Sequence, residues 1–150
     1  MTKQDHRVSM SASVSISDAY DKIARVSEWW TKFVDGNTRN VGDVFTVRFS
    51  EEDGGTFVTF AITEAVPGSR VVWHVTDCYL PWLTDKTEWN DTNVVFEIST
   101  NSDGSTVIMT HEGLTPEVEC FDACVKGWDY YIGKSLKQFV AIGEGLPNQR

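Results

Sequence analysis

The feature that most constrains this chain is a series of five segments between Val44 and Gly113 in which apolar residues occupy every second position. This is the periodicity of a strand with one buried face. Short turn sequences separate the segments, for example Pro67-Gly68-Ser69, and are typical of links between antiparallel neighbours. We therefore expect a meander. The segments are Phe45/Val47/Phe49, Val58/Phe60/Ile62, Val71/Trp73/Val75, Val94/Phe96/Ile98 and Val107/Met109/His111.

The residues before this region predict one strand and two short helices. Alternation over 6–14 indicates the strand. Ser17, followed by the acidic Asp18, has the sequence of a helix start, and Ser27 has the features of an N-cap for a second helical turn. We therefore expect two short helices after the first strand, one beginning at Ser17 and one at Ser27.

The residues after the strands predict one long amphipathic helix. Thr115-Pro116-Glu117 combines an N-cap residue, a proline at the first helical position and an acidic first turn. From Val118 to Ile142 apolar residues recur in steps of three and four, so one face of the helix is buried. Gly143 supplies a stop signal.

Together these elements predict an α+β fold in which a curved antiparallel sheet of about six strands wraps around the long C-terminal helix. A twisted sheet curled around one helix leaves a space at its wide end. At 150 residues the chain is expected to form a single domain, 1–150, with residues 144–150 as a frayed tail.

Composition narrows the classes of partner. The chain has 13 Lys and Arg against 22 Asp and Glu, a net charge of −9, and no basic cluster, which argues against nucleic acid. Its apolar runs are too short for a membrane span. A polar N-terminus without a secretory signal and an odd count of three cysteines favour the cytoplasm, a reducing compartment, over a disulfide framework.

Several sequence motifs, in their order along the chain, resemble one known superfamily. They are Trp29-Trp30, Val41-Gly-Asp-Val-Phe45, Val66-Pro-Gly-Ser-Arg-Val-Val-Trp73, Lys86-Thr-Glu-Trp89 and Thr110-His-Glu-Gly-Leu114. Residues 8–143 resemble the START-like (SRPBCC, helix-grip) superfamily of polyketide cyclases and lipid-transfer domains. The narrower resemblance is to the branch named after the activator of Hsp90 ATPase (AHSA1-like), and it implies a helix-grip fold.

A cavity between helix and sheet would be lined mainly by aromatic residues. Trp82 lies in an apolar, proline-broken loop and is interpreted either as part of a lid or as part of an interface. For Trp73 and Trp128 the alternative is a purely structural place in the core. The candidate ligand-binding residues are Trp30, Phe33, Trp73, Trp82, Trp89, His111, Phe121, Cys124, Trp128 and Tyr131.

Two residues are weak candidates for acid–base chemistry. His111 ends an inward strand face and Glu88 lies beside Trp89, but the sequence does not show that they come within hydrogen-bond reach. A hydrogen-bonded core position is the alternative for His111. Cys120 and Cys124 lack the second ligand pair of a structural zinc site, so no metal or cofactor is predicted and Cys124 is interpreted as a small buried apolar residue.

These observations favour binding of a small, largely apolar molecule. The resemblance implies two alternatives: a stress-related protein that interacts with an Hsp90-like chaperone, and a cyclase, dehydratase or hydrolase-like enzyme acting on a carbonyl compound. The eukaryotic activator relies on a further N-terminal domain for much of its grip on the chaperone, and these residues do not supply one. Whether the chain is an enzyme stays open, and a homodimer paired through strand edges or the long helix is consistent with the fold.

Overall fold

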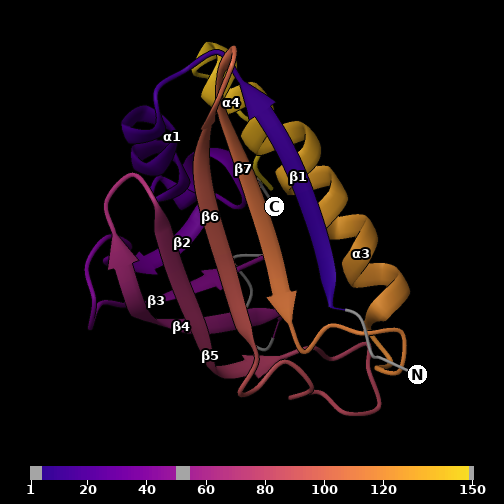
Figure 1. Cartoon of the computed structure of the whole chain (residues 1–150). Helices are drawn as coiled ribbons and strands as arrows, with labels where there is room; N and C mark the ends of the chain where they lie inside the picture. Colours follow the sequence, from indigo (N-terminus) through magenta and orange to yellow (C-terminus); the bar gives the residue numbers. More distant parts are fainter. Residues whose placement is uncertain (1–4, 50–54, 149–150) are drawn as a thin grey trace.

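The computed structural model describes residues 5–49 and 55–148, and within them the chain forms one antiparallel sheet of seven strands (Figure 1). The strand order is β1-β7-β6-β5-β4-β3-β2. This confirms the α+β class. The seventh strand is β2, which is short and pairs with β3 through Phe33 opposite Arg48. The strands are β1 (His6–Ala12), β2 (Phe33–Gly36), β3 (Val44–Arg48), β4 (Phe57–Val66), β5 (Arg70–Tyr79), β6 (Asn93–Asn101) and β7 (Gly104–Glu112).

A 22-residue helix packs against this sheet and runs beside β1 (Figure 1). It consists of α3 (Phe121–Tyr130), a π-helical turn η1 (Tyr131–Leu136) and α4 (Lys137–Ile142). The short helices α1 (Ile16–Ile23) and α2 (Val26–Trp29) follow β1, as predicted. The sheet bends because β4 and β5 shift register twice, between Thr59 and Phe60 and between Ile62 and Glu64.

Aromatic rings fill the end of the sheet that lies under α1 and α2. Trp29, Trp30 and Trp73 are each at most 3% exposed. Trp30 stacks at 6.0 Å on Trp29 and at 6.2 Å on Trp73, and Phe45 and Phe96 close around them. Such rings bury large apolar areas and leave no room between them. Space for a ligand therefore has to lie at the other end.

Three helix starts differ from the sequence prediction. Ser15, not Ser17, caps α1 by accepting the N–H of Asp18. The N-cap of α2 is Arg25 rather than Ser27. The expectation that the long helix begins near Thr115 was wrong: residues 115–120 form turns and the helix begins at Phe121. The physical reason is a cap from a distant carboxylate, described below.

The tail that was expected to fray from residue 144 makes hydrogen bonds to the rest of the chain as far as Asn148. The N–H of Asn148 donates to the carbonyl of Trp30 at 2.8 Å, and the N–H of Lys32 donates back to the carbonyl of Asn148 at 2.9 Å. The N–H of Leu146 donates to Ser135 Oγ at 2.7 Å. The tail thus adds a short extended pairing beside α2, while residues 149–150 lie outside the described part.

Ser135 offers a test of how this tail is held. Its hydroxyl is fully buried, donates to the Trp29 carbonyl at 2.6 Å and accepts the N–H of Leu146. We expect Ser135→Ala to lower the free energy of unfolding by about 1–3 kcal/mol, because two buried polar groups lose their partner. Urea unfolding measures this. The control Ser102→Ala, at an exposed turn, should stay within about 0.5 kcal/mol of the parent, and equal losses in both variants would contradict the assignment.

Candidate functional site

A cavity of about 290 Å³ opens between α3 and the loop of residues 80–92, which joins β5 to β6. One wall comes from the long helix and is formed by Ala123, Cys124, Gly127, Trp128 and Tyr131. The facing wall comes from the sheet and the loop and is formed by Phe49, Thr56, Val58, Leu80 and Trp82. Trp30 and Trp89 complete it. No charged side chain is among these described lining residues.

Six of the ten predicted ligand-binding residues line this cavity: Trp30, Trp82, Trp89, Cys124, Trp128 and Tyr131. The other four lie elsewhere. Trp73 is in the aromatic core, and Phe33 lies in β2. Phe121 contacts His6 edge to face at 6.3 Å, and His111 is fully buried behind the cavity.

Sequence reasoning missed the other half of the lining. Phe49 and Val58 belong to alternating runs that point inward, so their part in the cavity was available from the strand pattern. Ala123, Gly127 and Tyr131 follow one another at intervals of four residues, about one turn each, and so lie on one helix face. Two small residues on that face were the signal for a gap against the helix.

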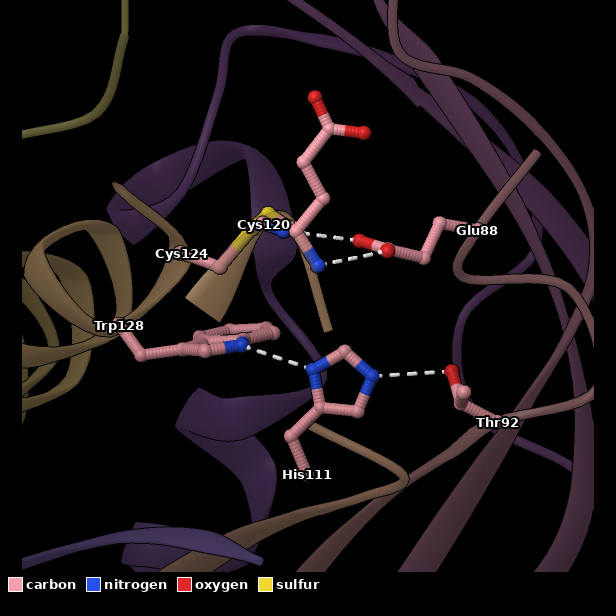
Figure 2. Close-up of a disulfide and its surroundings, with 7 residues drawn as sticks. Glu88, Thr92, His111, Cys120, Cys124 and Trp128 are labelled. Carbon is pink, nitrogen blue, oxygen red and sulfur yellow. Dashed lines mark hydrogen bonds between the residues drawn. A yellow bond between two sulfur atoms is a disulfide. The ribbon is translucent and has the colours of Figure 1, made fainter. Parts of the chain in front are cut away.

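His111 is held by a chain of hydrogen bonds (Figure 2). The indole N–H of Trp128 donates to Nδ1 of His111 at 3.0 Å, and Nε2 of His111 lies 2.9 Å from Thr92 Oγ1. Because an indole N–H can only donate, Nδ1 is the acceptor and the ring proton is on Nε2. The Thr92 hydroxyl then donates to the carbonyl of Trp89 at 2.6 Å. Every polar atom along this chain has its partner.

Burial, together with the nearby His6, lowers the pKa of His111 from 6.5 to about 3. The imidazole is therefore neutral at physiological pH. It does not line this cavity, and it fixes the indole of Trp128 so that the polar edge of that ring points away from the cavity. The structure places His111 as a positioning residue for Trp128.

Glu88 ties the loop to the start of α3 (Figure 2). Its two carboxylate oxygens accept the N–H groups of Glu119 at 2.8 Å and Cys120 at 2.9 Å. In return the carboxylate of Glu119 accepts the N–H of Thr84 at 2.9 Å and 3.1 Å. A helix N-terminus favours carboxylates, which explains why α3 begins only here. Glu88 and His111, the two acid–base candidates, are thus both engaged in hydrogen bonds that hold the structure together.

The expectation that the cysteines favour a reduced state over disulfides was wrong for two of the three. Cys120 and Cys124 form a disulfide across the first turn of α3, where their Cα atoms are 5.6 Å apart, within the range a disulfide needs. Cys124 therefore reaches the cavity as half of a disulfide. Cys78 is free and buried under the 80–92 loop, and burial raises its pKa.

The cavity offers few polar groups. Thr56 contributes a hydroxyl, and Tyr131 contributes a phenol whose pKa is raised by burial and by the neighbouring Tyr130. The indole Nε1 of Trp89 is buried without a hydrogen-bond partner among the described residues. Across residues 5–49 and 55–148, no three His, Cys, Asp or Glu side chains gather as metal ligands. In the same residues no helix is long and apolar enough to cross a membrane.

A family model for activator of Hsp90 ATPase homolog 1-like proteins matches residues 15–141. The chain belongs to this family. A search of curated proteins finds no match. This AHSA1-like chain shares 23% identity with the Aha1 dimer of Colwellia psychrerythraea, solved in solution, with a TM-score of 0.72 over 97% of this chain and 100% of that one.

Two crystal structures are similar as well. MLL2253 from Mesorhizobium loti has 16% identity and a TM-score of 0.69, covering 90% of this chain and 95% of its own. SSP2350 from Staphylococcus saprophyticus has 14% identity and a TM-score of 0.70, covering 95% and 96%. These matches show that the AHSA1-like chain has the helix-grip fold, while the identities are too low to transfer an activity.

The buried histidine predicts a specific pH dependence of the AHSA1-like chain. Its folded pKa lies below its ordinary value, so the unfolded chain takes up the proton first as the pH falls. The contribution of His111 to the free energy of unfolding is therefore fully present above about pH 6.5, and it is lost as the pH falls toward the folded pKa of about 3. We expect His111→Leu to flatten the slope of unfolding free energy against pH by up to about 1.4 kcal/mol per unit, measured by urea unfolding between pH 7 and 4.

At pH 7 the same variant should be less stable by about 1–3 kcal/mol or more, because Trp128 and Thr92 lose their partner. The control Ser135→Ala removes two buried hydrogen bonds without removing a titratable group, and should keep the parent slope. Parallel pH profiles for His111→Leu and the parent would contradict the account.

The attachment of the 80–92 loop to α3 through Glu88 predicts an effect on stability and on hydrogen exchange. Glu88→Ala should lower the unfolding free energy by about 1–2 kcal/mol, because two N–H groups at the start of α3 lose their cap. Backbone hydrogen exchange at Glu119 and Cys120 should speed up. The control is Asp85→Ala in the same loop, whose carboxylate accepts from the backbone N–H and the hydroxyl of nearby Thr87. Unchanged exchange at both amides in Glu88→Ala would show that the cap does not hold the helix start.

Proposed function

We propose that this protein binds a small, largely apolar molecule without negative charge in the cavity between α3 and the 80–92 loop. The observation that carries the proposal is the lining: four tryptophans and no charged side chain among the described residues surround a space of about 290 Å³. Ligand sites are concave and mostly apolar, with volumes from about 300 Å³ upward. This cavity fits the small end of that range.

Electrostatics supports an uncharged or positively charged ligand over an anion. The chain carries a net charge of −9, and the helix end nearest the cavity, which could attract an anion, is already occupied by the carboxylate of Glu88. His111 is neutral and turned away. The hydroxyls of Thr56 and Tyr131 can orient one polar group of a bound molecule.

The neutral fluorescent probe N-phenyl-1-naphthylamine tests the proposal. We expect saturable binding, seen as a rise in probe fluorescence and as an added mass in native mass spectrometry that vanishes on denaturation. Trp82→Ala should weaken binding by roughly tenfold, since this half-exposed ring lines the cavity. Tyr130→Ala removes an exposed ring outside the lining and should bind as the parent does. Absence of saturable binding in the parent would sink the proposal.

A second candidate function follows from family membership. We propose as the alternative that the protein acts on an Hsp90-type chaperone, supported by the match to the family of activator of Hsp90 ATPase homolog 1-like proteins. The test is the ATPase rate of Hsp90 with and without this protein at several salt concentrations. An acidic protein would act most strongly at low salt. The cyclase, dehydratase or hydrolase alternative gains no support, because His111 and Glu88 are engaged in structural hydrogen bonds.

Three further expectations are proposals: a homodimer, a single domain and a cytoplasmic location. The similarity to a dimer of Aha1 supports pairing of two copies, which light scattering of the purified protein tests. The single-domain organisation and the cytoplasmic location expected from the sequence stay predictions.

A further inference from the structure

Gly127 occupies a position where glycine has no structural use. It lies in the interior of α3 with an ordinary helical backbone rather than a positive φ. Among common residues only proline is less favourable than glycine in a helix interior. Among the described residues, none lies within 4 Å of a Cβ atom built on Gly127, so none of them demands the absence of a side chain.

Two other glycines of this region lie in different surroundings. Gly143 has a φ of +83°, which ends the helix in a left-handed conformation. At Gly133 a Cβ would contact Val8 at 3.8 Å, an ordinary packing distance, so an alanine there would pack against β1. A side chain at Gly127 would instead extend into open space among the described residues, and Gly127 is part of the cavity lining.

At Gly127 the helical wall of the cavity is therefore bare backbone, with the side chains of Cys124, Trp128 and Tyr131 elsewhere on the same wall. Ala123, one turn before Gly127, adds only a methyl group, so the two residues form a flat surface on α3. Aromatic rings of Trp30, Trp89 and Trp82 belong to the same lining. A flat helical surface beside aromatic rings accommodates a planar molecule better than a thick one, and ring-to-ring contact is favourable beyond simple burial.

We propose that Gly127 keeps open a slot against the backbone of α3, and that the ligand is a planar, uncharged ring compound lying in that slot. This deepens the proposed function and rests on it. Tyr131, one turn after Gly127, brings its hydroxyl to the same helix face and can bond a single polar substituent of the ring.

Three probes with related skeletons test the ligand class by calorimetric titration of the parent protein. 2-Naphthol is planar and uncharged, decahydro-2-naphthol is saturated and thicker, and 2-naphthoate is planar but anionic. We expect 2-naphthol to bind at least tenfold more tightly than either of the others. Equal binding of decahydro-2-naphthol would overturn planarity, and equal binding of 2-naphthoate would overturn the requirement for an uncharged ring.

Variants at Gly127 test the slot. Gly127→Ala should raise the melting temperature by roughly 2–4 °C, because alanine favours the helix, and yet weaken 2-naphthol binding by at least threefold. Gly127→Leu should weaken it by at least thirtyfold. Gly133→Ala, in the same long helix but outside the lining, should bind 2-naphthol as the parent does. A purely structural glycine would not combine higher stability with lost affinity.

The outcomes separate this inference from the function on which it rests. Full affinity of Gly127→Leu for 2-naphthol, with N-phenyl-1-naphthylamine still bound by the parent, would overturn the slot and leave the apolar site standing. If the parent binds neither probe, both the slot and the proposed function are wrong.

Discussion

The polar edge of Trp128 imposes the constraint on which the packing of the long helix depends. This residue is 2% exposed, and a buried indole N–H without a partner would cost about 1–3 kcal/mol. The helix can therefore pack against the sheet only where a hydrogen-bond acceptor faces this N–H, and Nδ1 of His111 on β7 is that acceptor. Thr92 fixes the other side of the imidazole. These two hydrogen bonds join helix, sheet and loop, and the bond to Trp128 sets which surface of its ring faces the cavity.

The interior between helix and sheet has a filled end and an open end. Trp29, Trp30 and Trp73 stack under the short helices and fill one end. At the other end the 80–92 loop stands over α3 and is tied to it by reciprocal carboxylate bonds of Glu88 and Glu119. The space between loop and helix is small, apolar and defined, which is why a binding role is better supported than acid–base chemistry.

Local patterns predicted the parts of this fold that depend on neighbouring residues. Alternation revealed the long strands, and steps of three and four revealed the long helix, whose Trp128 and Tyr131 line the cavity. The features that were missed depend on partners far apart in sequence. The cap from Glu88 onto Cys120 and the anchoring of the tail by Ser135 involve residues 32 and 11 positions apart, and no local signal marks them. The strand at Phe33–Gly36 is too short to show alternation.

Entry of a ligand between the 80–92 loop and α3 can be followed directly through the six indole N–H signals of the protein. A ¹⁵N-edited NMR titration with 2-naphthol should move the signals of Trp82, Trp89, Trp30 and Trp128, which line the cavity. Trp29 and Trp73, in the filled core, should move little. Saturable shifts confined to the first four would confirm the site. Shifts that are largest at Trp29 and Trp73, or absent from all six, would contradict it.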